Sequence, residues 1–209
     1  MRNGPDLWAA LLGDIVPVFG GDAVVAGGAI RDFHLGLEPK DIDIWVNCPD
    51  PSTFAGRAKL LEQKADTAYN WYLSLTQEAE TTYDGTAIGD GMTIYEGNAV
   101  IFGDPLYDPE DPFQPKTLAD IVVNVIYHPD HQDGIPALVE RFDMDICQGW
   151  FSGGLLHRTP AMQQALLTKT ATALRPSEHA RTARRFDRFA ARNPGVLTFV
   201  NPFQGSLDL

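Results

Sequence analysis

Two short segments near the N-terminus contain the residues best suited to chemistry. Residues 27–32 have the sequence GGAIRD, and residues 39–44 have the sequence PKDIDI. They predict a double-glycine turn leading into a short helix, followed by a strand that carries two aspartates on one face. Such parts would hold a triphosphate beside divalent metal ions, which is what phosphoryl or nucleotidyl transfer requires.

Asp41 and Asp43 are two positions apart, so in a strand both side chains point to one face, while Ile42 and Ile44 point to the core. Two ionised carboxylates roughly 4 Å apart repel by about 4 kcal/mol at an effective dielectric constant near ~20. A cation between them would remove that cost. Mg²⁺, or alternatively Mn²⁺, suits carboxylates combined with substrate phosphates. Taken alone, the pattern also fits a solvated strand face without function.

Gly27 and Gly28 precede the predicted helix, whose first backbone N–H groups would be free to bind an anion. Because glycine has no Cβ atom, a phosphate could approach the backbone closely there. Arg31, on the first turn of that helix, could bind phosphate oxygens. The alternatives are a plain strand-to-helix turn and a surface arginine paired with Asp32.

A third carboxylate is expected on another strand near the first pair. Residues 142–147, with the sequence FDMDIC, supply Asp143 and Asp145 as candidates. An acidic side chain inside an apolar strand is costly unless it is paired or bound to a metal, although an edge strand facing water would tolerate it. Asp143 is the preferred third ligand, with Asp145 as the alternative metal ligand.

The remaining pattern predicts one α/β (α+β) domain over residues 1–209, with an insertion or mobile loop at 66–118 and a helical C-terminal segment at 159–193. Helices are expected at 5–19, 29–35, 52–64, 135–141, 160–167 and 177–193. Strands are expected at 23–26, 41–46, 121–127 and 142–147, together with a hairpin within 92–102.

Composition restricts the classes of partner. The net charge of -12 is strongly acidic, so non-specific binding to duplex DNA is not expected. Basic side chains are nevertheless concentrated near the C-terminus, where Arg181, Arg184 and Arg185 could neutralise triphosphate charge or form a solvated helix face.

Location is predicted from what the sequence contains. Cys48 and Cys147 lack the spacing of a zinc site and are expected to be buried free thiols, as in a reducing compartment. Neither a signal peptide nor a membrane-spanning run is expected, which predicts a cytoplasmic protein without a membrane partner.

The combination of a double glycine, a helix, an Asp-x-Asp strand and a later aspartate resembles the nucleotidyltransferase superfamily of DNA polymerase beta. Residues 27–32 and 39–43 are similar to the Gly-Gly-x-Val-Arg-Asp and Lys-Asp-Ile-Asp signatures in the head domain of CCA-adding enzymes and bacterial poly(A) polymerases. The clear resemblance covers about residues 23–46. Weaker similarity to small phage-type nucleotidyltransferases extends to 122–127, 142–148 and 181–199.

This resemblance implies a nucleotidyltransferase fold, a mixed β-sheet flanked by helices. It implies that Gly27 and Gly28 cradle the triphosphate, that Asp41 and Asp43 bind both metals, and that Asp143 completes the site. The expected reaction moves a nucleoside monophosphate from a nucleoside triphosphate such as ATP to an acceptor hydroxyl, with release of pyrophosphate.

The sequence allows more than one acceptor and more than one class of activity. CCA-adding enzymes continue into helical regions that select the base and hold tRNA, and this chain ends before them, which argues against template-free CCA addition. The acceptor could be an RNA end, a protein or a small molecule, including the target of a toxin-like enzyme. The competing class is a catalytically inactive module for nucleotide sensing or protein interaction, although an intact set of aspartates argues against decay.

Overall fold

The computed structural model of the 209-residue chain describes residues 4–19, 23–62, 71–77, 82–83, 86–87, 93–102, 117–128 and 133–204. Helices and strands alternate from α1 to β3, strands follow as far as β7, and the rest of the chain mixes helices with short strands. The first elements are α1 (Pro5–Phe19), β1 (Ala23–Ala26), α2 (Gly28–His34), β2 (Asp41–Val46), α3 (Pro51–Glu62), β3 (Trp71–Gln77), β4 (Thr82–Tyr83), β5 (Thr86–Ala87), β6 (Thr93–Phe102) and β7 (Thr117–Tyr127). The later elements are α4 (Ile135–Glu140), the 3-10 turn η2 (Asp145–Cys147), β8 (Gly149–Ser152), β9 (Leu155–Arg158), α5 (Pro160–Thr168), β10 (Thr170–Thr172), the 3-10 turn η3 (Pro176–Glu178), α6 (His179–Arg192) and β11 (Thr198–Val200).

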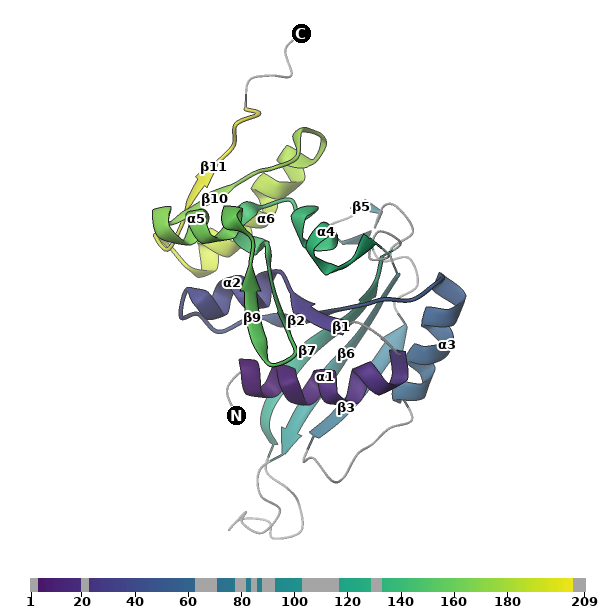
Figure 1. The fold of residues 1–209 in the computed structure, drawn as a ribbon. Coiled ribbons are helices and arrows are strands. Elements are labelled where there is room, and N and C mark those ends of the chain that lie inside the picture. Colours follow the sequence, from purple (N-terminus) through teal and green to yellow (C-terminus); the bar gives the residue numbers. More distant parts are fainter. Residues whose placement is uncertain are drawn as a thin grey trace.

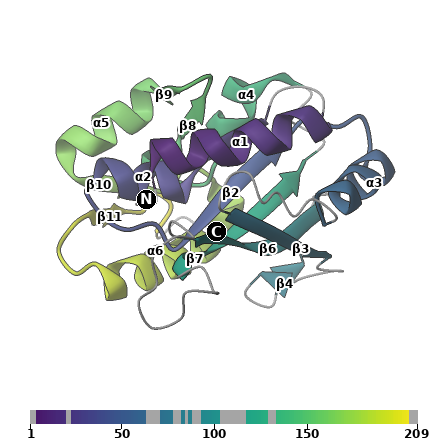
Figure 2. The same ribbon diagram turned by 90° about the horizontal axis from the view of Figure 1, so that it is seen from below.

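A seven-stranded mixed sheet with the order β3-β6-β7-β2-β1-β8-β9 forms the centre of the fold. Its strands pair antiparallel except for β2 and β7, which run parallel. Helix α1 crosses one face of this sheet (Figure 1), and the view from below places α1 and α6 on opposite sides of β2 (Figure 2). The β2 strand therefore has an apolar helix on one face and the C-terminal arginine-rich helix beyond the other.

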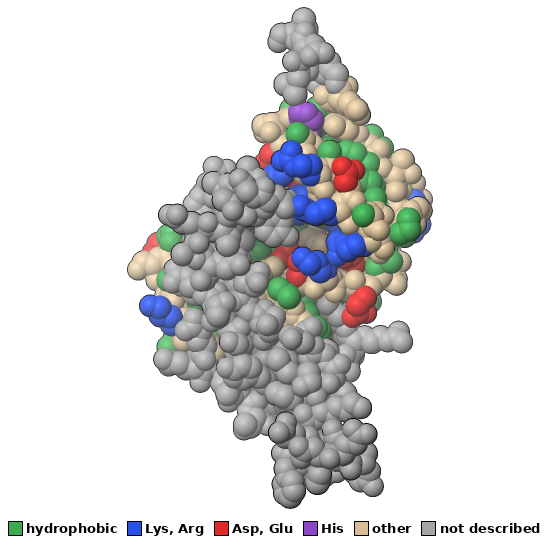
Figure 3. Space-filling view, turned by 180° about the vertical axis from the view of Figure 1, so that it is seen from behind, with side chains coloured by type: hydrophobic (Ala, Val, Ile, Leu, Met, Phe, Trp, Pro, Cys, Tyr) green, Lys and Arg blue, Asp and Glu red, His purple; other side chains and the backbone are tan. Residues whose placement is uncertain are grey.

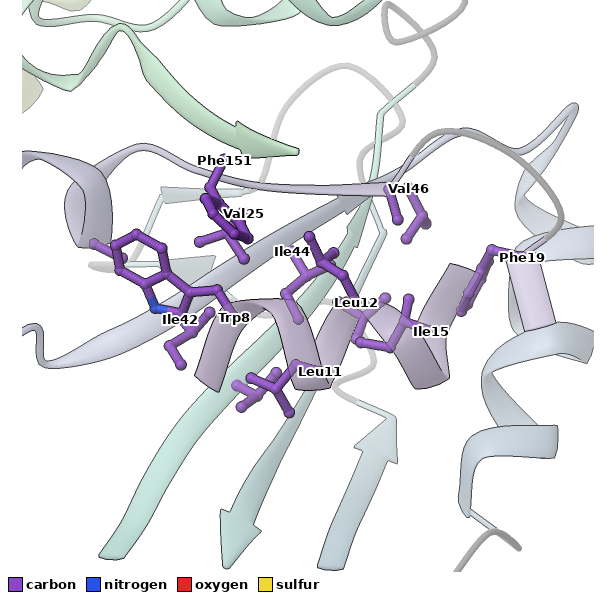
Figure 4. Close-up of a cluster of buried hydrophobic side chains, with 14 of the residues drawn as sticks. Trp8, Leu11, Leu12, Ile15, Phe19, Val25, Ile42, Ile44, Val46 and Phe151 are labelled. Atoms are coloured by element: carbon purple, nitrogen blue, oxygen red, sulfur yellow. The ribbon is translucent and has the colours of Figure 1, made fainter. Parts of the chain in front are cut away.

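The main core lies between α1, α3 and one face of the sheet. Alternation along β2 places Ile42, Ile44 and Val46 on this face, where all three are fully buried. They pack under Trp8 and Ile15 of α1 (Figure 4). Because a one-residue slip would turn the whole apolar set to the other face, this packing fixes which side of β2 carries the aspartates.

A second apolar cluster joins the C-terminal elements to α2. It contains Ile146 of η2, Ala171 of β10, and Phe186 and Phe189 of α6. β10 and β11 form a separate two-stranded parallel sheet. The cluster positions α6 next to the glycine turn that starts α2, because the Arg31 guanidinium of α2 lies 4.3 Å from the centre of the Phe189 ring.

The expected mixed sheet flanked by helices, with a helical C-terminal segment, is present. Cys48 and Cys147 are both buried free thiols, as predicted. None of the helices in the described part of the chain is long and apolar enough to cross a membrane.

Two local predictions are wrong. The hairpin expected within 92–102 is one strand, β6, which pairs along its length with β7 on one side and β3 on the other. Residues 142–147 form no strand: Met144 makes a single bridge to Ala173, and η2 follows it. The predicted insertion at 66–118 contains β3 and β6, which extend the main sheet, the small β4–β5 pair and the start of β7; its other residues fall outside the described part of the chain.

Candidate active site

Asp41 and Asp43 lie on the face of β2 that points away from α1, and both are half-buried. Their positions alternate with fully buried Ile42 and Ile44, as the sequence pattern predicts. Lys40 approaches Asp41 at 3.8 Å between Nζ and Oδ2, but its side chain is 65% exposed, so this ion pair is worth little. The strand backbone, rather than the Lys40 ion pair, therefore holds the two carboxylates on one face.

The Gly27 turn lies directly against Asp43. Gly27 has φ +88°, a conformation that side chains other than glycine rarely adopt, and it caps the start of α2. A Cβ atom there would lie 4.0 Å from Asp43 Oδ2 and 3.5 Å from the Phe142 ring. Gly28, the next residue, is half-exposed. The fold thus brings the double glycine and the second aspartate together, as the sequence suggested.

Asn124 of β7 is a site residue that the sequence reasoning missed. It pairs with Asp43 in the parallel β2–β7 register, and its Nδ2 donates a hydrogen bond to Asp43 Oδ1 at 2.9 Å. Its own Oδ1 is buried and has no hydrogen-bond partner among the residues that the structure describes. The available signal was a lone amide in the centre of the otherwise apolar segment 121–127, because a buried amide needs a partner.

The environment of Asp43 opposes its ionisation. Burial, followed by the like charge of Asp41, raises the pKa of Asp43 from its usual value of 3.8 to about 6. The Asn124 hydrogen bond and the charges of Arg185 and Lys40 act in the opposite direction. A buried carboxyl that resists ionisation beside a second carboxylate forms a site that favours a cation.

We expect Asp43→Asn to stabilise the metal-free protein near neutral pH. The native Asp43 carboxyl holds its proton more tightly than the unfolded chain does, so native stability falls as pH rises from 3.8 to about 6 and stays reduced above that. Asn cannot ionise and can still accept the Asn124 hydrogen bond. With a chelator present at about pH 7.5, the variant should gain about 1–3 kcal/mol in unfolding free energy.

Urea unfolding at several pH values measures this effect. The gain should shrink as pH falls and vanish by about pH 3, where the carboxyl is protonated in both the native and the unfolded state. Asp6→Asn, an exposed position on α1, is the matched control and should show no such dependence. A gain of equal size at both pH values would show that ionisation of Asp43 is not the cause.

Asp143 is buried with only 5% of its surface exposed, and it is paired with α6. Arg185 Nη1 donates to both of its carboxylate oxygens at 2.9 Å, and Thr182 Oγ1 donates to Oδ2 at 3.0 Å. A buried carboxylate of this kind requires such partners. Since the Arg185 charge also lowers the pKa of Asp43, Arg185 links Asp143 to the Asp41–Asp43 pair.

Asp145 binds backbone rather than α6. Its Oδ1 accepts hydrogen bonds from the backbone N–H groups of Ile146 at 2.7 Å and Thr172 at 2.8 Å. These bonds fix the η2 turn against β10. In the part of the chain that the structure describes, no group of three His, Cys, Asp or Glu side chains is placed to hold a metal ion. The roles predicted for Asp143 and Asp145 as metal ligands therefore remain predictions.

The predicted phosphate-binding arginines differ in accessibility. Arg31 is buried, donates to Asp32 Oδ1 at 2.7 Å and contacts Cys147 Sγ at 3.6 Å, while its Nη2 lies 3.7 Å from the position of a Cβ on Gly28. Arg184 of α6 is exposed. Arg181 pairs with Glu178 at 3.7 Å, with about a third of its side chain exposed. Basic side chains gather beside acidic ones on the back of the molecule (Figure 3).

We expect Arg185→Met to destabilise the protein by about 1–3 kcal/mol, because it leaves the Asp143 carboxylate buried without its main partner. Arg184→Met, on the adjacent exposed position, is the matched control and should be nearly neutral. Adding Asp143→Asn to Arg185→Met should recover part of the loss in urea unfolding, since no bare charge remains. Equal effects of the two single variants would contradict a structural ion pair.

Comparison with known proteins identifies the fold. No protein-family model and no curated protein matches the sequence. A tRNA-processing enzyme in an apo form matches with a TM-score of 0.54 and 18% identity, covering 93% of this chain and 43% of that one. The Thermotoga maritima CCA-adding enzyme complexed with tRNA matches with a TM-score of 0.55 and 16% identity, covering 95% of this chain and 40% of that one. A CCA-adding enzyme complexed with ATP gives a TM-score of 0.54 and 16% identity, covering 94% of this chain and 40% of that one.

These matches confirm the predicted fold class, a mixed sheet flanked by helices like the nucleotidyltransferase domain of CCA-adding enzymes. The chain spans less than half the length of the structures it matches. At this level of identity the comparison establishes the fold, and the chemistry has to be argued from the residues.

Proposed function

We propose that this chain is a metal-dependent nucleotidyltransferase that moves a nucleoside monophosphate from a nucleoside triphosphate to an acceptor hydroxyl. The observation that carries this proposal is the projection of Asp41 and Asp43 from one strand face against the Gly27 turn. A tRNA-processing enzyme with CTP and a CCA-adding enzyme with ATP share the fold, which supports a nucleoside triphosphate as the substrate class.

The donor set fits a hard divalent cation. Both carboxylates are partly accessible and share one strand face, the Lys40–Asp41 ion pair is exposed, and burial and mutual repulsion raise the pKa of Asp43. Asp41 and Asp43 would hold Mg²⁺ or Mn²⁺. The cation would supply a more acidic acceptor hydroxyl and charge stabilisation on the phosphate oxygens.

The other residues would bind and orient the triphosphate. Gly27 places no side chain beside Asp43 and Gly28 is partly exposed, while Arg185 adds a positive charge to the same region. Asp143 would then act as a positioning residue that holds the Arg185 guanidinium through two hydrogen bonds. Exposed Arg184 and half-exposed Arg181 extend positive charge along α6 for phosphate groups farther from the reaction centre.

The acceptor has to supply a hydroxyl group beside the bound triphosphate. The Thermotoga maritima CCA-adding enzyme binds tRNA, and an RNA end is one acceptor that the α6 arginines could contact here. A protein side chain or a small molecule would serve the same chemistry, because transfer requires only a hydroxyl within reach of the α-phosphate.

One observation favours the alternative, a catalytically inactive module that senses nucleotides or binds a protein. Among the described residues, no third carboxylate joins Asp41 and Asp43 in a group that could hold a metal. Pyrophosphate release separates the two functions, since an inactive module would bind a triphosphate without cleaving it.

We expect Asp41→Asn and Asp43→Asn each to abolish pyrophosphate release from a labelled triphosphate while leaving the fold intact by circular dichroism. The reason is that either change removes a negative ligand that the cation needs. Asp6→Asn on α1, on the other side of the sheet, is the control and should retain native activity. Full activity in either site variant would remove the metal model.

We also expect Mg²⁺ and a nucleoside triphosphate to raise the melting temperature together by more than either does alone, because the folded state alone would bind the pair. A thermal shift assay with each of the common nucleotides measures this and indicates base preference. The same experiment on Asp43→Asn should show no joint shift. Absence of a shift with every nucleotide in the native protein would contradict nucleotide binding.

A further inference from the structure

We infer that Asn124 is a third protein ligand of the catalytic cation, through its amide oxygen. This inference rests on the proposed function, since it assigns a residue to the same cation that Asp41 and Asp43 would hold. It concerns a neutral side chain that the sequence patterns did not single out. Its basis is the position, burial and hydrogen bonding of this one amide.

Strand pairing places Asn124 at the site. In the parallel β2–β7 register, Asn124 is the partner of Asp43, and Val122 is the partner of Asp41. Directly paired residues share a face of a sheet, so Asn124 projects to the face of the carboxylates, while Val123 and Val125 enter the core. The bond from Nδ2 to Asp43 Oδ1, at 2.9 Å, fixes the amide against that carboxylate.

The amide oxygen of Asn124 needs a partner that the described protein atoms do not provide. Asn124 is only 8% exposed, and its Oδ1 is buried without a hydrogen bond. A buried carbonyl oxygen without a donor or a cation is costly, and native proteins rarely retain one. An apolar residue at this position would avoid that cost, so the amide fits a role that requires an oxygen.

A divalent cation at Asp43 would satisfy this atom. Amide carbonyls and carboxylates are both ligands of hard cations. In the observed orientation Nδ2 donates to Asp43 Oδ1, so a cation bound beside that carboxylate could take Oδ1 as a ligand without breaking this bond. Two carboxylates and one neutral oxygen carry two negative charges, which one divalent ion balances.

The charge count explains why an amide is suited to this position. Asp at position 124 would face Asp43 directly across the strand pair, adding a third negative charge beside two carboxylates on the same face. The amide supplies an oxygen without that penalty. The site would thus be weaker for a cation than a three-carboxylate site, but less destabilising when empty.

The test measures Mn²⁺ binding to the full chain in the presence of a non-hydrolysable triphosphate. The electron paramagnetic resonance signal of free Mn²⁺ reports how much of the ion is bound. Asn124→Leu, of similar size, should weaken Mn²⁺ binding by at least about tenfold. Asn124→Asp should bind Mn²⁺ as tightly as the native protein or more tightly, and should lower the melting temperature in chelator through charge repulsion. Val122→Ala, on the same strand face, is the control for packing and should bind as the native protein does.

The outcomes separate this inference from the proposed function. Native-like Mn²⁺ binding by Asp41→Asn and Asp43→Asn would overturn the proposed function itself. Loss of binding in those variants, with native-like binding by Asn124→Leu, would overturn only the role of Asn124. Equal weakening by Asn124→Leu and Val122→Ala, or loss of binding by Asn124→Asp, would also overturn it, because the effect would then come from packing rather than from an oxygen ligand.

Discussion

The repulsion between the carboxylates of Asp41 and Asp43 is the constraint on which the site depends. Both side chains are held on one face of β2 because Ile42 and Ile44 on the other face are fully buried under α1. Turning the strand to separate the carboxylates from the glycine turn would expose that core. The hydrophobic packing therefore holds together two like charges that would otherwise move apart. A bound cation would relieve their repulsion, which would make its binding more favourable.

The C-terminal elements supply positive charge near these carboxylates. Arg185 pairs with buried Asp143 and also lowers the pKa of Asp43, so one guanidinium acts on two acidic positions. The α6 helix is held in place by the apolar cluster around Phe186 and Phe189. The chain has a net charge of -12, and its positive charge is concentrated on α6. Under the proposed function, a triphosphate bound beside the carboxylates would lie near this helix.

Local pattern predicted the elements near the glycine turn well. The bounds of α1, β1 and β2 follow directly from apolar periodicity and from glycine and proline at the boundaries. Prediction failed where pairing decides structure. The segment 142–147 has the alternation of a strand, yet Asp145 binds the backbone N–H groups of Ile146 and Thr172 and forms a turn instead. Residues 93–102 contain turn-like Glu96 and Gly97, yet pairing on both sides keeps β6 continuous.

By itself the sequence determined that two aspartates share a strand face and that a double glycine starts the helix before that strand. It also determined that basic residues concentrate near the C-terminus. These are properties of near neighbours along the chain, where period and residue type suffice. Only the tertiary structure decided that Asn124 would face Asp43 and that Asp143 would be paired with Arg185. Those contacts join residues 81 and 42 positions apart, and the packing of strands and helices sets them because no local rule encodes their register.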